Sequence, residues 1–264
     1  MHKFVLLCSR ELEEIVAMLI RQCVRLKGVY IMDETIGLSL IEDLKNESEK
    51  FYDEGKSYLL LQEYYKGLPK DTLRPLFYCE DKWIRRVAIW ITAELGTEGG
   101  HLLEEVIMLM NEDDYDNYVL GYAIEIVTNC ARNKNIHHFA RAFLFLEYTD
   151  QVIRLSAMST ISALSRERIH EVYVYMANNI DYANYVTGLL SLLNSDTISS
   201  SEINRMIDDN NAIVRKYGII IAKKLYKKYP RIIIEAVNNQ DSDVKEFSKI
   251  VIKVKLEMKE LKRK

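Results

Sequence analysis

Apolar residues recur along the chain at offsets that fit one face of an α-helix, and the pattern returns at a regular interval. We anchor it on six aliphatic residues: Ile84, Val119, Ile153, Val186, Val214 and Val244. Successive anchors are separated by 35, 34, 33, 28 and 30 residues. Apolar or small residues follow each anchor by four and seven positions, and by eleven in the better-formed copies. These offsets fall on one helix face, so the pattern predicts a series of amphipathic helices.

The fourth residue after the anchor is small in five of the six copies. These small residues are Ala88, Ala123, Ala157, Gly218 and Ser248, whereas the fourth copy has Leu190. A short side chain allows a neighbouring helix to approach closely. We therefore expect the same close helix contact in each repeat.

A capping residue and a basic residue accompany most anchors. Three positions before the anchor stand Asp81, Asp116, Asp150, Asn211 and Asp241. Asp and Asn side chains accept hydrogen bonds from the free N–H groups of a helix start, so we predict five N-caps. Directly after the anchor come Arg85, Arg154, Arg215 and Lys245. The copy at residues 181–210 lacks both features.

Shorter second helices are predicted between the anchored ones. They cover about residues 99–110, 135–147, 167–178, 200–207 and 230–238, and a last helix covers about 242–262. Residues 1–80 lack the repeat, but they contain helix candidates at 9–27, 33–45 and 49–65. We expect an all-α protein, an α-α superhelix of about five to six helical pairs. Residues 1–80 would form an irregular helical N-terminal cap, and 81–264 one continuous domain of repeats.

The order of capping Asp, aliphatic–Arg pair, small residue and aliphatic stripe resembles the HEAT repeat family. The best copy is residues 81–89 (DKWIRRVAI), followed by residues 150–157 (DQVIRLSA). The resemblance implies a HEAT-like α-solenoid, in which each helix pair buries its apolar face against the next pair. It says little about a ligand.

The composition favours long helices, and the cysteine pattern favours a reducing compartment. Hydrophobic residues make up 48% of the 264 positions, enough for a sizeable core, and only 3 prolines and 10 glycines are present. No apolar run reaches the ~18 residues of a membrane span. The apolar stretch at 4–8 is too short for a signal peptide. The four cysteines form no CxxC pair. We therefore expect a cytoplasmic protein without a membrane segment.

The formal net charge of −3 conceals an uneven distribution. Residues 212–264 contain 15 Lys/Arg and 6 Asp/Glu, a balance of +9, so residues 1–211 have a balance of −12. An acidic body attracts a basic partner over long range. Ordinary solubility charge with a basic C-terminal helix is the alternative.

Candidate chemistry is sparse. Gly96, Gly99 and Gly100 lack the lysine of a phosphate-binding loop, and His137 and His138 are adjacent rather than at metal-ligand spacing. No nucleophile elbow or Cys-centred signature is present. We predict no catalytic residue, no metal and no cofactor, and hence a non-catalytic protein.

A protein-binding surface is the stronger hypothesis, because acidic residues and tyrosines gather near the second helices. The candidate residues are Glu104, Glu105, Glu112, Asp113, Asp114, Tyr115, Glu147 and Tyr148. Tyrosine is enriched in binding surfaces, although many tyrosines simply lie between core and water. Trp83 either packs under its own repeat or is exposed at a repeat edge. The expected partner is a basic protein rather than a nucleic acid.

Three further segments narrow this hypothesis. Residues 58–69 (YLLLQEYYKGLP), 73–76 (LRPL) and 90–96 (WITAELG) resemble small bacterial HEAT-like proteins associated with polymorphic toxin loci. The resemblance implies an immunity protein, which binds and neutralises a cognate toxin domain. Many such toxins are nucleases with basic clefts, so an acidic inhibitor would mimic the substrate.

Two alternatives involve nucleic acid. Trp83, Arg85, Arg86, Ala88 and Ile89 resemble the HEAT-like alkylpurine DNA glycosylases, which implies a DNA-binding enzyme. Such an enzyme needs a basic groove, which the acidic body contradicts. The other alternative is RNA binding by a C-terminal strip, or simply a solvated face, made of Lys223, Lys224, Lys227 and Lys228 with Tyr226 and Tyr229.

Overall fold

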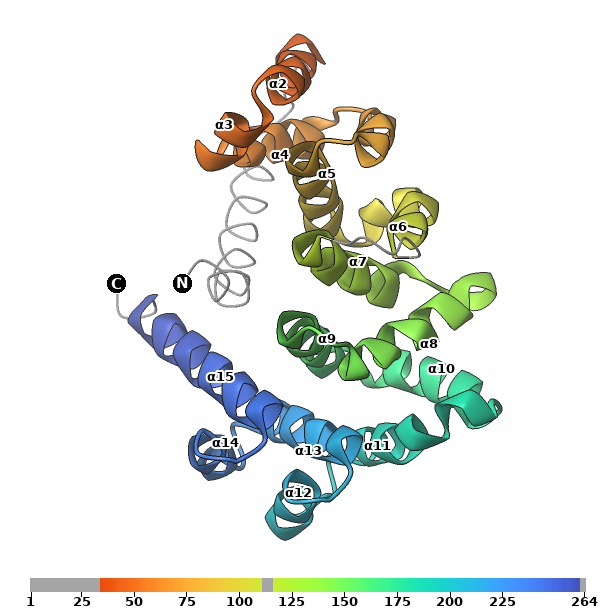
Figure 1. Cartoon of the computed structure of the whole chain (residues 1–264), viewed down its shortest axis with the longest axis vertical. Coiled ribbons are helices and arrows are strands. Elements are labelled where there is room, and N and C mark those ends of the chain that lie inside the picture. Colours follow the sequence, from red (N-terminus) through yellow and green to blue (C-terminus); the bar gives the residue numbers. More distant parts are fainter. Residues whose placement is uncertain (1–33, 111–115, 262–264) are drawn as a thin grey trace. The chain divides into compact units, whose positions relative to one another are not determined.

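The computed structural model describes residues 34–110 and 116–261, and every regular element within them is a helix (Figure 1). The prediction of an all-α protein is confirmed for this part of the chain. The described residues form two compact units, one ending at Ala131 and the other beginning at Arg132. This division lies inside the segment for which one continuous series of repeats was predicted.

The first unit contains the described residues before the repeats, from Glu34 on, together with the first two anchored helices. Its elements are α2 (Glu34–Asn46), α3 (Ser48–Asp53), α4 (Lys56–Lys66), η2 (Lys70–Tyr78), α5 (Lys82–Glu94), η3 (Gly96–Leu102), α6 (Leu103–Leu109) and α7 (Asn117–Cys130). The helix predicted at 49–65 is split because Gly55 has a φ of 70°, and Gly67, with a φ of 117°, ends α4. The helix candidate at 9–27 lies outside the described residues.

The second unit begins with the 3₁₀ helix η4 (Asn133–Asn135). It continues with α8 (Ile136–Leu144), η5 (Phe145–Glu147), α9 (Gln151–Ala163), α10 (Arg166–Ala177), η6 (Ile180–Tyr182), α11 (Ala183–Leu193), α12 (Ser200–Ile207), α13 (Ala212–Lys224), α14 (Pro230–Ala236) and α15 (Ser242–Leu261). The second helices predicted from the sequence agree with α8, α10, α12 and α14 to within a few residues. Pro230 occupies the first turn of α14, where its missing N–H is harmless.

All five predicted N-caps are confirmed. The side chains of Asp81, Asp116 and Asp150 each accept a hydrogen bond from the backbone N–H two residues later. Asn211 and Asp241 each accept from two N–H groups of the first turn. The helix α11, in the copy without a capping residue, has no side-chain cap.

The arginine after the anchor clamps the loop before its own helix. Arg154 Nη1 donates to the carbonyl oxygens of Tyr148 and Thr149, at 2.7 and 2.8 Å. Arg85 and Arg215 bind the carbonyls five and six residues before them in the same way. The recurring arginine therefore has a local structural role, because it satisfies loop carbonyls that no helix can satisfy.

Packing in the second unit is not limited to consecutive helices. Helix α9 packs against both α13 and α15; α12 packs against α13, and α14 packs against both α13 and α15. Figure 1 shows α9 on one side of α13 and α15, and α12 and α14 on the other. Helices α9 and α15 contain the third and the sixth anchor, so their contact joins two copies of the pattern that are three repeats apart in the sequence.

The predicted close helix contacts are present where a small residue occurs. Ala88, Ala123, Ala157 and Ser248 are completely buried. A Cβ atom on Gly218 would lie 2.9 Å from the backbone nitrogen of Ile207, so α12 and α13 approach at this glycine.

The fourth copy has a different register from the predicted one. Leu190, aligned with the small residues, is 45% exposed, while Tyr185, Leu189 and Leu192 are buried. The close contact is made by Gly188, where an added Cβ would lie 2.1 Å from the Tyr217 ring. Val186 was therefore the wrong anchor, because the capping residue that fixed the register elsewhere is missing.

Candidate binding surfaces

The acidic residues predicted on α6 lie on two different faces. Glu104 is exposed in the first turn, whereas Glu105 is 4% exposed and forms an ion pair with Arg74 of η2. Glu105 lies on the same face as the buried residues Leu102 and Leu109. Its assignment to an exposed binding surface was therefore wrong, because the orientation of α6 buries this side chain against η2.

The remaining predicted residues are divided between the units. Glu112, Asp113, Asp114 and Tyr115 lie outside the described residues. Glu147 and Tyr148 belong to the second unit, where Glu147 is exposed and Tyr148 is half-buried.

Glu147 and Tyr148 both have partners within the second unit. The Glu147 carboxylate accepts a hydrogen bond of 2.5 Å from the hydroxyl group of Tyr185. Burial raises the pKa of the Tyr185 phenol, and the hydrogen bond to Glu147 raises it further. The Tyr148 ring packs on Phe145, with ring centroids 5.5 Å apart. These two residues are thus firmly positioned at the end of η5.

A second group of side chains in the first unit is more concentrated. We call it the aromatic cluster: Tyr52, Trp83, Arg86, Tyr118 and Tyr122. The Tyr52 ring lies 5.0 Å from Trp83 and 6.1 Å from Tyr118, centroid to centroid. Tyr118 lies 5.0 Å from Tyr122. Tyr122 is buried, and the other four members are half-buried.

A guanidinium group holds the aromatic cluster together. Arg86 lies 4.6 Å from the Trp83 ring centroid and 5.3 Å from that of Tyr118, within cation–π range. It donates two hydrogen bonds to the Asp116 carboxylate, of 2.5 and 3.1 Å. Burial opposes the charge of Arg86, but its hydrogen bonds to Asp116 and the charge of that carboxylate together outweigh burial and raise the pKa of Arg86. Asp116 therefore balances the charge of Arg86, while the exposed Lys82 places a second cation 4.9 Å from the Trp83 ring centroid.

Sequence reasoning missed the aromatic cluster, although the signal for it was present. Trp83 and Tyr118 each precede an anchor by one position, in consecutive copies of the repeat. Equivalent residues of packed neighbouring repeats lie side by side, and α5 packs against α7. Trp83 is half-buried, and its ring packs against that of Tyr52, on α3.

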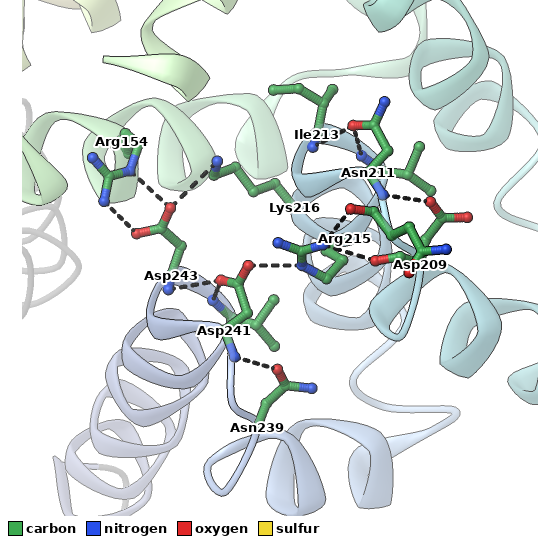
Figure 2. Close-up of polar contacts among 12 residues, drawn as sticks. Arg154, Asp209, Asn211, Ile213, Arg215, Lys216, Asn239, Asp241 and Asp243 are labelled. Carbon is green, nitrogen blue, oxygen red and sulfur yellow. Dashed lines mark hydrogen bonds and ion pairs between the residues drawn. The ribbon is translucent and has the colours of Figure 1, made fainter. Parts of the chain in front are cut away.

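A network of charged residues in the second unit connects α9, α13 and α15 (Figure 2). Asp243 accepts hydrogen bonds of 2.7 and 2.9 Å from Arg154, and its carboxylate lies 3.3 Å from the Lys216 ammonium. Asp241 accepts a bond of 2.7 Å from Arg215. Lys216 and Asp243 have side-chain exposures of 6% and 7%, so this network fixes helices rather than offering charges to a ligand.

The predicted lysine strip is interrupted in the same unit. Lys224 donates to the carbonyl oxygens of Ser162 and Leu164 at 3.0 and 2.7 Å, and burial lowers its pKa. It therefore caps the end of α9, whereas Lys227 and Lys228 are exposed. Lys224 was wrongly assigned to a solvated face.

The described residues contain no candidate metal cluster and no candidate membrane span. Among residues 34–110 and 116–261, no group of three or more His, Cys, Asp or Glu side chains could hold a metal ion. No helix in that part of the chain is both long and apolar enough to span a membrane.

The amino-acid sequence matches no protein-family model, and comparison with curated proteins gives no significant match.

Proposed function

We propose that this protein is a non-catalytic, HEAT-like α-solenoid that binds another protein through the aromatic cluster and the acidic residues near it. The repeated caps and arginine clamps support the solenoid, because each is built from the same positions in successive copies. A stack of such units presents a long surface, which suits recognition of a macromolecule.

The aromatic cluster is the observation that carries this proposal. Trp, Tyr and Arg are the residue types most enriched among those that dominate the binding energy of protein interfaces. Here Trp83, Arg86 and Tyr118 are half-buried and held in place by mutual contacts and by Asp116. Side chains that are already ordered lose little entropy when a partner binds.

We further propose that the partner is a basic toxin domain, and that this protein is its bacterial, cytoplasmic immunity protein. The balance of −12 over residues 1–211 supports this choice, because it favours encounter with a basic surface. The acidic run at 112–114 comes two residues before Asp116 in the sequence, and Asp116 pairs with Arg86 of the aromatic cluster. Exposed Glu104 lies in the same unit.

The DNA glycosylase alternative receives less support from the same region. The resemblance rested on five residues, of which Arg85 and Arg86 are the cations: Trp83, Arg85, Arg86, Ala88 and Ile89. Arg85 donates to the carbonyls of Cys79 and Glu80, and Arg86 is neutralised by Asp116. A phosphate-binding surface needs cations directed at the ligand, and both guanidinium groups already have internal acceptors.

Binding to the product of the adjacent open reading frame tests the proposed function. We expect a complex by titration calorimetry, and we expect Trp83→Ala to weaken it by about 30-fold, the effect of removing one dominant contact. Tyr78→Ala is the matched control, because Tyr78 is an exposed aromatic residue of the same unit outside the cluster. Circular dichroism establishes that both variants are folded.

Two results would overturn the proposed function. One is an adjacent gene product that neither binds this protein nor harms cells. The other is salt-dependent binding of a DNA duplex that is abolished by Arg86→Ala, which would favour the glycosylase alternative.

A further inference from the structure

The connection between α13 and α14 concentrates positive charge. Residues 223–231 (KKLYKKYPR) contain five Lys or Arg residues and two tyrosines, and no Asp or Glu. Lys227, Lys228 and Arg231 are exposed. The ion pair of Arg231 with Glu235 is 3.4 Å long, and both side chains are largely in solvent, so it holds little of the charge of Arg231.

Hydrogen bonds hold this connection in one conformation. The N–H groups of Lys228 and Tyr229 both donate to the Leu225 carbonyl oxygen, at 2.8 and 2.9 Å. Lys224 donates to the Leu164 carbonyl oxygen at the end of α9, which secures the connection to a neighbouring helix. The exposed lysines thus belong to an ordered turn, and less entropy is lost when a ligand binds.

The two exposed lysines have no carboxylate partner. Among residues 34–110 and 116–261, no Asp or Glu oxygen lies within ion-pair distance of Lys227 or Lys228. Other exposed lysines, such as Lys50 and Lys249, each lie 2.7 Å from the oxygen of a glutamate three positions before. Lys228 instead lies 4.8 Å from the Tyr229 ring centroid. Both lysine charges are therefore available to an anion outside the chain.

Most carboxylates on the neighbouring connections are already engaged. Asp196 forms an ion pair of 3.2 Å with Arg166. Glu202 accepts hydrogen bonds from the backbone N–H and the hydroxyl group of Ser199, at 2.9 and 2.7 Å. Glu167 is exposed and has no ion pair within the described part of the chain. One such carboxylate does not offset the three exposed cations of the connection.

The two tyrosines of the connection differ in their contacts. Tyr226 and Tyr229 are half-buried, and neither ring contacts another aromatic ring among the described residues. The Tyr229 hydroxyl group lies 3.5 Å from the Ile198 carbonyl oxygen, and Lys228 lies over the ring. Tyr226 has no such contacts in that part of the chain, so its ring can stack on a planar group of a ligand.

We propose that the connection between α13 and α14 binds single-stranded nucleic acid. The binding residues, which we call the α13–α14 surface, are Tyr226, Lys227, Lys228 and Arg231. The three cations would face phosphate groups, and one base would stack on Tyr226. Residues 132–261 contain 19 Lys/Arg and 15 Asp/Glu, a balance of +4, so the second unit does not repel a polyanion.

The residue types favour a nucleic acid over an acidic protein. Lysine is depleted in protein interfaces, whereas it binds phosphate readily as a point charge. Surfaces that bind single strands without sequence preference combine such cations with aromatic side chains on which bases stack. A paired duplex would offer no unstacked base to Tyr226. This inference goes beyond the proposed function, because it concerns the second unit and a partner of opposite charge, so either can fail without the other.

Fluorescence anisotropy of a short fluorescein-labelled oligouridine, titrated with the full-length protein, tests the α13–α14 surface. We expect binding that weakens as salt is added, because binding releases the counterions of the phosphates. The double variant Lys227→Gln/Lys228→Gln should lower the slope of log K against log[salt] by about 1.4, since each phosphate contact of a single strand contributes roughly 0.7. Lys249→Gln/Lys253→Gln is the matched control. It removes the same charge from exposed lysines of α15 in the same unit and should leave the slope unchanged.

Tyr226 gives an independent readout. Tyr226→Ala should weaken binding by about tenfold without changing the salt slope, because it removes the stacking of one base and no charge. The proposal is overturned if the oligouridine does not bind, or if the two double variants bind it equally well. It is also overturned if polyglutamate binds as tightly as the oligouridine and Tyr226→Ala weakens neither, which would indicate an acidic protein partner. Circular dichroism establishes that all variants are folded.

Discussion

Arg154 and Asp243 are 89 residues apart in the sequence and form a two-bond ion pair, with Nε donating to Oδ2 and Nη2 donating to Oδ1. Arg154 also donates to the Tyr148 carbonyl, so one guanidinium group connects α15, α9 and the loop before α9. Planar guanidinium and carboxylate groups match each other well in this arrangement. Asp243 is buried, and Lys216 from α13 approaches the same carboxylate.

Asp243→Asn should destabilise the protein strongly, by about 3 kcal/mol, because it leaves the buried Lys216 and the half-buried Arg154 without their anion. Asp196→Asn is the matched control. Asp196 also pairs with an arginine, Arg166, but both side chains are largely exposed, so its removal should change stability little. Urea unfolding followed by circular dichroism measures both. Equal effects of the two substitutions would contradict a special role for the buried pair.

The contribution of Asp243 should also depend on pH. Burial would raise the pKa of this carboxyl group, but the hydrogen bond from Arg154 and the charge of Lys216 outweigh burial and lower the pKa below 3.8, its ordinary value. A lowered pKa in the folded state stabilises the fold at any pH above the unfolded-state value. This stabilisation is lost as the pH falls through the folded-state value.

The stability difference between the wild type and Asp243→Asn measures this contribution. We expect it to be constant from about pH 7 to about pH 5 and to shrink below about pH 4. Thermal unfolding across this range is a suitable measurement. A difference that is unchanged at the most acidic pH would show that the loss of the carboxylate charge is not the cause.

Two buried tyrosines should respond in opposite directions to the loss of their hydroxyl groups. Tyr217 is completely buried, and its hydroxyl group has no hydrogen-bond partner among the described residues. Tyr217→Phe should therefore stabilise the protein by about 1 kcal/mol. Tyr185→Phe removes the bond to Glu147 and should destabilise by about 1.5 kcal/mol. Denaturant unfolding of both variants checks the signs, and destabilisation by Tyr217→Phe would indicate a partner for its hydroxyl group.

The sequence predicted best those elements of the fold whose position is set by residues close together in the chain. A capping residue and its N–H partner are two positions apart, so Asp81, Asp116 and Asp150 could be identified from spacing alone. The copy around Val186 was placed in the wrong register for the same reason, since it has no cap to fix where the helix begins.

The contacts that sequence did not predict are those set by how helices are packed. Glu104 and Glu105 are equivalent in the sequence, and only the orientation of α6 determines that one is exposed and the other is buried against η2. The pair of Arg154 and Asp243 depends on the contact of α9 with α15, which is not a contact between consecutive repeats. No local pattern specifies such a contact.

The candidate sites show the same limit. Charged residues stand out in a sequence, so the predicted binding surface consisted mainly of them. Four residues of that surface, Glu112 to Tyr115, lie outside the described residues. The aromatic cluster required the packing of α5 against α7 and the approach of Tyr52, on α3, to both Trp83 and Tyr118. Aligning the positions before each anchor, rather than only the anchors, would have brought Trp83 and Tyr118 together.

Gly188→Ala should destabilise the protein although alanine is the better helix former. A methyl group at this position would overlap the Tyr217 ring, whose nearest atom lies 2.1 Å from the position of the added Cβ. The helix propensity gained is at most about 1 kcal/mol, while forcing extra volume into a packed contact costs typically 1–3 kcal/mol. We expect a net loss of about 1 kcal/mol in the free energy of unfolding.

A double-mutant cycle identifies the cause of that loss. Combining Gly188→Ala with Tyr217→Ala removes the ring that the methyl group would overlap, so the second substitution should make the first neutral or stabilising. Leu190→Ala, two positions along the same helix and exposed, serves as the control and should have little effect in either background. Strict additivity of Gly188→Ala and Tyr217→Ala would mean that α11 and α13 do not meet at this glycine.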